Sequence, residues 1–286
     1  MKNKAFKRLI YGLTACVLSF SLLSFKIYNE PPQRDTTSAT GYRLKTIIVD
    51  AGHGGVKAGA SGSFSLEKNV TLQIAFKLQK AIEKELNDVK VVMTRTNDDD
   101  VSLQKRSDIA NNNKGDLFIS IHCNSLPDHI TYSHGRKIRV QDHSGKGVLL
   151  LVYGFHRTKE EERAIKENLV ESGDQEMNSG LDPNDPTSII LLNTYKTKYR
   201  KQSIRLADLI NREFIDGDGR RSEGIREQGV LVLCHTAMPS VLVETGYINN
   251  AEEEEYLNSE QGQNEIVNSI VRAVKQYKRE VEQSNQ

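Results

Sequence analysis

The sequence contains few cysteines and almost no excess of positive over negative charge. Each of these shortages excludes one class of protein. Three of its 286 residues are cysteines, and one of them, Cys16, lies in the apolar N-terminal stretch. The remaining Cys123 and Cys234 are too few for a fold held together by disulfide bonds. The formal net charge is +1, so no general electrostatic attraction to nucleic acid is expected.

The N-terminus carries the features of an export signal. An apolar stretch, 9–25, follows the basic residues Lys2, Lys4, Lys7 and Arg8. The stretch is shorter than the roughly 20 residues of a membrane-spanning helix, yet no small-residue cleavage site follows it. We expect residues 1–28 to be a signal peptide or an N-terminal membrane anchor, and the protein to be exported to the periplasm or cell envelope.

The rest of the chain has an ordinary globular composition, with 37% apolar and 27% charged residues. Residues 29–41 are polar, contain Pro31-Pro32 and show no apolar periodicity, so they are interpreted as a linker. Folding is predicted to start near Tyr42 and to continue to about residue 281.

The folded part opens with a β-branched apolar run, about 44–50, that stops at a histidine set among glycines. The run predicts a buried strand, and the glycines around His53 allow a sharp turn at its carboxyl end, where open α/β sheets bind their ligands. A single histidine in such a loop is more often a surface residue. Two further residues change this interpretation.

Glu67, preceded by Ser65 as a candidate cap, opens an apolar pattern with helical spacing over about 67–86, and His122 ends a second buried run. Two histidines and one carboxylate, each at the end of a regular element, form the three-ligand set of a catalytic zinc, with one position left for water. Regular elements hold such ligands with the accuracy that a metal site needs. The pattern therefore predicts one zinc ion per chain, bound by His53, Glu67 and His122.

A further carboxylate, Glu244, lies near the end of an apolar run, 240–246, that predicts a strand. Burial disfavours a charged carboxylate and raises its pKa towards the range useful for proton transfer. The apolar run 230–233 predicts another strand. Residues 126–147 are predicted to be irregular, and their three histidines to be surface residues: His129, His134 and His143.

Residues 157–192 interrupt the alternation of strands and helices. A charged helical pattern, 157–171, is followed by a polar stretch that contains Asp182-Pro183-Asn184-Asp185-Pro186, and a helix resumes near Asn193. This segment is therefore predicted to be an excursion from the domain.

Four motifs together resemble the zinc-dependent N-acetylmuramoyl-L-alanine amidases of the amidase 3 type. In chain order they are DAGHGG (50–55), Glu67, SIHCN (120–124) and MPSVLVETGYINN (238–250). The resemblance covers about 42–281. Ala51 stands where proline is more usual in these enzymes, and Cys123 where alanine is common, but neither difference removes a functional group.

The resemblance implies a single α/β domain with a roughly six-stranded mixed sheet flanked by helices. It also implies hydrolysis of the amide bond between N-acetylmuramic acid and L-alanine of peptidoglycan, in cell-wall remodelling or daughter-cell separation. By matching position, His53, Glu67 and His122 resemble the zinc ligands and Glu244 the catalytic carboxylate. Some relatives cover the zinc with a helix inserted at the position of 157–192 until a partner displaces it. An activator protein acting on this segment is thus one expectation, and a plain surface helix is the other.

Two other functions fit the same residues. A zinc peptidase or carboxypeptidase that cuts another peptidoglycan stem bond would use the same ligands, because the ligands do not encode which bond is cut. A non-catalytic wall-binding module would need no proton shuttle, and the presence of Glu244 argues against it.

Overall fold

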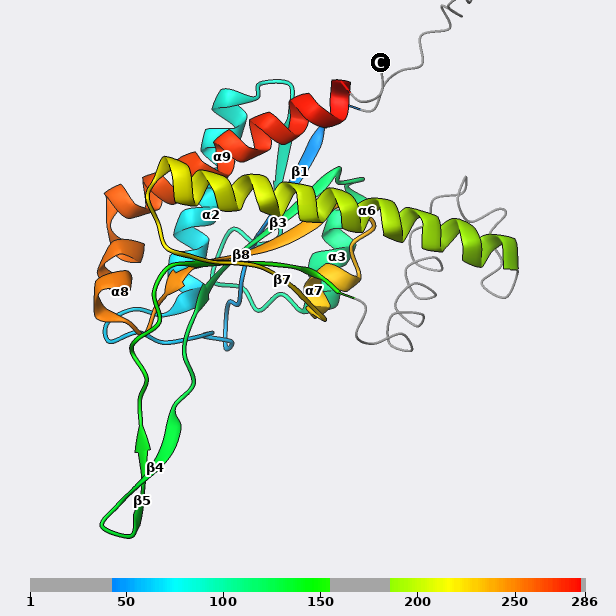
Figure 1. Ribbon diagram of the computed structural model, residues 1–286. Coiled ribbons are helices and arrows are strands. Elements are labelled where there is room, and N and C mark those ends of the chain that lie inside the picture. Colours follow the sequence, from blue (N-terminus) through cyan, green and yellow to red (C-terminus); the bar gives the residue numbers. More distant parts are fainter. Residues whose placement is uncertain (1–42, 155–185, 284–286) are drawn as a thin grey trace, which may run out of the picture. The chain divides into compact units, whose positions relative to one another are not determined.

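The fold is built on a six-stranded mixed sheet that carries helices on both faces (Figure 1). The computed structural model describes residues 43–154 and 186–283. Neighbouring strands, in the order β2-β1-β3-β8-β6-β7, are parallel except for the antiparallel pair β8 and β6. The strands are β1 (Thr46–Ala51), β2 (Lys90–Met93), β3 (Leu117–Asn124), β6 (Val148–Tyr153), β7 (Ser222–Gln228) and β8 (Ser240–Tyr247). This architecture confirms the predicted α/β fold.

Alternate residues of the central strands face two separate hydrophobic layers. In β1, Ile47 and Val49 pack towards α2, α6 and α9, whereas Ile48 packs on the opposite side with α3 and α7. Because both faces are buried, these strands are continuous apolar runs in the sequence. The helices are α2 (Glu67–Glu85), α3 (Leu103–Asn112), α6 (Pro186–Arg212), α7 (Leu231–Cys234), α8 (Ala251–Asn258) and α9 (Glu260–Gln283). A short π-helical turn, η1 (Glu213–Gly217), follows α6.

The structure corrects several predictions about single segments. Residues 230–233 do not form a strand: the Leu233 and Cys234 amides donate to the Val230 carbonyl, which makes the one-turn helix α7. A run of four apolar residues is too short to distinguish a strand from a helix. The strand at this edge of the sheet is β7, which the sequence pattern did not predict, and α6 begins at Pro186 rather than near Asn193.

The stretch predicted to be irregular, 126–147, contains a hairpin. Strands β4 (His129–Ser133) and β5 (Arg136–Val140) pair antiparallel in a small sheet of their own and extend away from the six-stranded sheet (Figure 1). The turn between them has positive φ at His134 and Gly135, as a tight two-residue hairpin turn requires.

Some predictions lie outside the described residues. These are the export segment 1–28, the linker 29–41 and most of the segment 157–192, of which the part from residue 186 onwards belongs to α6. Among the helices that the structure does describe, none is both long and apolar enough to cross a membrane.

One carboxylate ties the C-terminal part of the domain to the loop in front of α2. Glu254, on α8 (Ala251–Asn258), accepts hydrogen bonds from the backbone amides of Ser63, Phe64 and Ser65. The Ser63 and Ser65 hydroxyls also donate to it, so Ser65 does not cap α2 as predicted; the N-cap residue is Leu66. Burial tends to raise the pKa of Glu254, but these hydrogen bonds outweigh it and lower the pKa to about 2.

From these hydrogen bonds we predict that Glu254→Gln lowers the free energy of unfolding in a pH-dependent way. Because the pKa of Glu254 is lower in the folded chain than its ordinary 4.5, its ionised form stabilises the fold above pH 4.5, and this stability is lost as the pH falls towards 2. At pH 7 the variant should lose about 2 kcal/mol in free energy of unfolding, measured by urea denaturation. At pH 4 the difference should be smaller, and exposed Glu255→Gln should change little at either pH. An equal difference at both values would contradict this role.

Candidate metal centre

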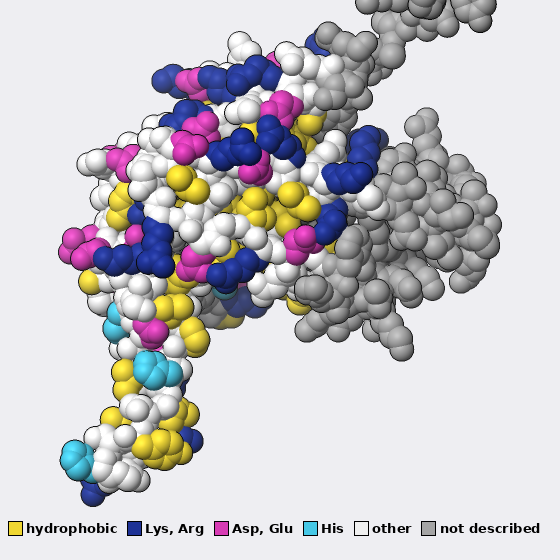
Figure 2. All heavy atoms as spheres, viewed as in Figure 1, with side chains coloured by type: hydrophobic (Ala, Val, Ile, Leu, Met, Phe, Trp, Pro, Cys, Tyr) yellow, Lys and Arg dark blue, Asp and Glu magenta, His cyan; other side chains and the backbone are white. Residues whose placement is uncertain are grey.

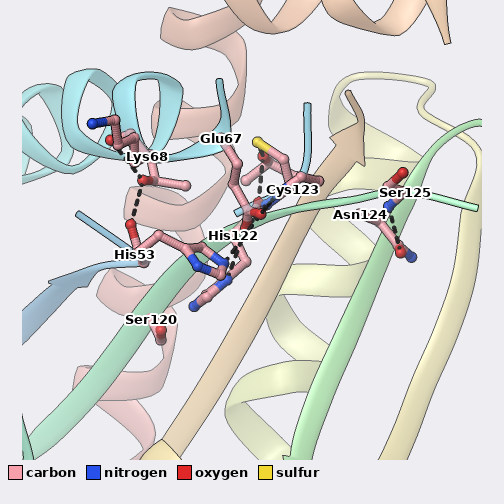
Figure 3. A network of polar contacts seen from close by, with 12 residues as sticks. His53, Glu67, Lys68, Ser120, His122, Cys123, Asn124 and Ser125 are labelled. Carbon is pink, nitrogen blue, oxygen red and sulfur yellow. Dashed lines mark hydrogen bonds and ion pairs between the residues drawn. The ribbon is translucent and has the colours of Figure 1, made fainter. Parts of the chain in front are cut away.

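The predicted site residues meet at the carboxyl ends of parallel strands. His53 follows β1, His122 lies near the end of β3, and Glu67 is the first residue of α2 (Figure 3). Strands β3 and β8 pair in a register that places His122 beside Glu244. The carboxyl ends of neighbouring parallel strands lie side by side, and open α/β folds bind their ligands there.

The Glu67 carboxylate lies between the two imidazoles. Its Oε2 is 3.1 Å from His53 Nε2, and its Oε1 is 2.9 Å from His122 Nδ1. The two rings meet edge to face, with centroids 4.9 Å apart. One ligand atom from each of the three residues lies within 4.8 Å of the others, so this group could hold a metal ion. In the described part of the chain it is the one such group, and His129, His134 and His143 do not join it.

Electrostatics keep Glu67 ionised. Burial raises the pKa of this carboxyl group, but hydrogen bonds and charge from His122 and His53 outweigh burial and hold the pKa well below its usual range. Burial in turn lowers the pKa of His122, while the hydrogen bond and charge of Glu67 raise it by more. A backbone amide adds to this environment, since Cys123 N donates to Glu67 Oε1 over 3.0 Å. Glu67 is therefore a preformed anionic ligand.

Two glycines make room for the ligands. A Cβ atom on Gly52 would lie 2.5 Å from the His122 ring, and one on Gly59 would lie 2.4 Å from Glu67 Oε2. Gly59 also has a φ of +73°, a conformation that favours glycine. His53 itself has a φ of 60°, which is uncommon for a residue with a side chain and is found where neighbouring contacts impose it.

Those contacts come from two buried arginines. Arg106 Nη2 donates to the His53 carbonyl over 2.5 Å, and its Nη1 donates to the Ala51 carbonyl over 2.6 Å. Arg95 Nη2 donates to the Gly52 carbonyl over 2.8 Å. The two guanidinium groups therefore hold three successive carbonyls of the loop that carries His53.

Asp50 balances the charge of Arg106. Its Oδ1 accepts from Arg106 Nη1 and from Thr94 Oγ1, and its Oδ2 accepts from Ser120 Oγ, each over 2.6 Å. Burial raises the pKa of Asp50, but the charge of Arg106 and these hydrogen bonds lower it below its ordinary value. No role for Asp50, Arg95 or Arg106 was predicted from the sequence. A carboxylate that closes an apolar strand was the signal for Asp50, and it is the same signal that identified Glu244.

Glu244 has the opposite environment. Burial is the main cause that raises the pKa of Glu244, to about 7. Charge from His122 lowers the pKa and charge from Glu67 raises it, so the carboxyl group senses both residues. Its Oε2 is buried and has no hydrogen-bond partner among the described residues. A carboxylate with a free oxygen and a pKa near 7 is suited to take up and release a proton.

Comparisons with known proteins give matches over most of the chain. A family model described as N-acetylmuramoyl-L-alanine amidase matches residues 47–276. The chain is 33% identical over 249 residues to a probable cell wall amidase, LytH, of Staphylococcus epidermidis, covering 86% of this chain and 62% of that protein. It is 32% identical over 238 residues to N-acetylmuramoyl-L-alanine amidase AmiC of Escherichia coli, covering 81% of this chain and 52% of that one. The chain thus spans little more than half the length of these two relatives.

Among solved structures, N-acetylmuramoyl-L-alanine amidase AmiC2 of Nostoc punctiforme is similar with a TM-score of 0.52 and 26% identity, over 83% of this chain and 98% of that chain. The fold and the His–Glu–His group thus define an α/β protein with a candidate metal centre at the carboxyl ends of its strands. The chain belongs to the N-acetylmuramoyl-L-alanine amidase family.

The packing of Gly52 predicts that Gly52→Ala displaces the His122 ring. The added methyl group cannot remain 2.5 Å from the imidazole, so His122 must shift from its place beside Glu67. Affinity for a divalent metal should fall roughly 10- to 100-fold, as it does when groups that orient ligands are changed. Titration with zinc followed by calorimetry measures this. The control is Gly229→Ala, because a Cβ there meets nothing within 4 Å. Equal affinities in the two variants would contradict the packing argument.

Proposed function

We propose that this chain is a zinc-dependent hydrolase that cleaves the amide bond between N-acetylmuramic acid and L-alanine of peptidoglycan. The observation that carries the proposal is the convergence of His53, Glu67 and His122 beside the unpartnered oxygen of Glu244, in a member of this family. The proposal concerns residues 42–281 as the catalytic domain.

The donor set fits zinc. Two imidazole nitrogens and one carboxylate are the ligands of many catalytic zinc sites, which leave a fourth position for water or substrate. In this chain His53, Glu67 and His122 would hold one ion. When bound, zinc lowers the pKa of its water towards about 7 and polarises the carbonyl that is attacked.

Glu244 supplies the proton transfer in this proposal. The ordinary pKa of a glutamate, 4.5, makes a weak base, and burial of Glu244 moves the pKa to about 7. Its free Oε2 can accept the proton of the attacking water and return that proton to the leaving amine. Arg106 and Arg95 act at a distance from the reacting atoms, since they fix the backbone that carries His53. No serine or cysteine nucleophile is needed.

A cell-envelope location follows from the same proposal. The relatives are named as cell wall and N-acetylmuramoyl-L-alanine amidases, and peptidoglycan lies outside the cytoplasmic membrane. An export segment at 1–28, cleaved as a signal peptide or retained as an anchor, and the linker 29–41 are consistent with this location. An activator protein that acts on 157–192 stays a prediction from the sequence.

The first test is metal binding by His122→Ala. Loss of one imidazole leaves two ligands, so the variant should contain almost no zinc after purification and should be inactive, as measured by mass spectrometry of the metal and by hydrolysis of muropeptides. His129→Ala removes an exposed histidine of the hairpin and should keep both properties. Full zinc occupancy in His122→Ala would refute the ligand assignment.

The second test distinguishes loss of proton transfer from loss of the metal. It also identifies the bond that is cut. Glu244→Gln keeps the volume of the side chain but cannot accept a proton, so zinc content should stay near normal while turnover falls roughly 100-fold or more. Mass spectrometry of the wild-type products distinguishes release of an intact stem peptide with a free L-alanine amine from cleavage within the stem. Cleavage within the stem would favour a zinc peptidase, and no product at all would favour a wall-binding module.

A further inference from the structure

The hairpin β4–β5, here called the arm (129–140), has a composition unlike the rest of the surface. It contains Arg136, Lys137 and Arg139 but neither aspartate nor glutamate. Three large hydrophobic side chains are exposed on it: Ile130 is 55%, Tyr132 72% and Ile138 43% accessible. Figure 2 shows hydrophobic side chains along the projecting hairpin, with parts of basic side chains at its margins.

Strand register places an aromatic ring and cations on one face of the arm. Tyr132 is the cross-strand partner of Lys137, and Ile130 is the partner of Arg139, so these four side chains share a face. Arg139 forms an ion pair of 2.5 Å with Asp128 at the base of the arm. Lys137 and Arg136 form no ion pair with any described residue, so their charge is available to an external anion.

Protection of the strand edges does not explain this face. Charged residues on an exposed hairpin prevent pairing with other chains, which accounts for the basic side chains. Exposed tyrosine and isoleucine work against that protection, because apolar surface on a free strand promotes association. Their combination with cations is typical of a surface that binds an amphipathic, anionic ligand.

The chain on both sides of the arm is fastened to residues that follow β8, the strand that carries Glu244. The chain enters the arm from β3, which carries His122, and Asn249 Nδ2 donates to the Leu126 and Asp142 carbonyls over 3.2 and 2.8 Å. Asn250 Nδ2 donates to the His143 carbonyl over 2.6 Å. Both asparagines follow β8, which carries Glu244. A ligand on the arm is thus held in a fixed relation to the catalytic groups.

We propose that the face formed by Ile130, Tyr132, Lys137 and Arg139 binds uncleaved peptidoglycan strands while the metal centre cuts them. This inference rests on the proposed function. The Tyr132 ring packs against a sugar face, and Lys137 pairs with the free carboxylates of stem peptides. A strand of five residues is roughly 17 Å long, so the arm reaches beyond the single muramoyl unit at the metal centre.

The tip of the arm favours a wall polymer over a lipid surface. Its outermost pair is Ser133 with Arg136, and the turn is His134-Gly135, so the end that would enter a bilayer is polar. The apolar residues lie along the strands, where they face a ligand laid against the arm. Vesicles of phosphatidylglycerol therefore serve as the contrasting ligand in the test.

The test compares Tyr132→Ala/Lys137→Glu with a matched control, Ile215→Ala/Lys84→Glu, which removes an exposed isoleucine and reverses an exposed charge elsewhere. Binding to insoluble peptidoglycan, stripped of attached anionic polymers, is measured in a Glu244→Gln background so that the ligand stays intact. The arm variant should bind roughly tenfold more weakly and the control normally. Chemical amidation of the stem carboxylates should weaken binding of the unmodified arm to a similar extent.

Each of three binding results would overturn the proposal: equal binding by the arm variant and its control, binding insensitive to amidation, or arm-dependent binding to the vesicles instead of peptidoglycan. With Glu244 intact, the arm variant should lose about tenfold more activity on the insoluble polymer than on a soluble muramoyl tripeptide. Equal losses on both would show that the arm only supports the fold. An enzyme inactive on the soluble fragment would refute the proposed function itself, whereas the binding comparison would still decide the role of the arm.

Discussion

The candidate centre depends on the contacts of one buried guanidinium group, that of Arg106. It joins a carboxylate of the sheet, Asp50, to the backbone oxygens of Ala51 and His53 in the adjoining loop. A buried charge and a histidine with positive φ are each unfavourable alone, and this contact compensates both. Removal of either charged partner would leave the other uncompensated, so the pair positions the loop only as a unit. The sheet supplies the strands, and this pair, together with Arg95, fixes the backbone that carries the His53 imidazole.

The pKa values of two glutamates at this centre are shifted in opposite directions. Glu67 receives hydrogen bonds from both histidines and from the backbone amides of Ala60 and Cys123, and its pKa falls. Glu244 is buried without a partner for Oε2, and its pKa rises to about 7. Such a divergence separates a permanent anionic ligand from a group that exchanges protons near neutral pH, which is how one site combines metal binding with acid–base chemistry.

The strands and helices that could be predicted from the sequence are those with a short periodic pattern of apolar residues. Apolar runs that end at His122 and Glu244 located two central strands, and the pattern after Glu67 located α2, so the meeting of these residues followed from the geometry of a parallel sheet. The network of Arg95, Arg106 and Asp50 joins residues far apart in the chain, and no local pattern predicts such a contact. The arm escaped prediction because its strands are exposed and lack a buried face. Residues 230–233 were wrongly predicted to be a strand because four apolar residues fit one helical turn as well as a strand.

The direction of β6 determines where its last residues lie relative to the metal ligands. Strand β6 runs antiparallel to β8, so β6 ends level with the amino ends of β1, β3 and β8. His53 and His122 lie at the carboxyl ends of these strands, on the opposite side. Six residues of strand rise roughly 20 Å. Gly154, the last described residue before the gap at 155–185, therefore lies at the end of the strands far from the metal ligands. A partner that binds at Gly154 would lie at the opposite end of the strands from His53 and His122.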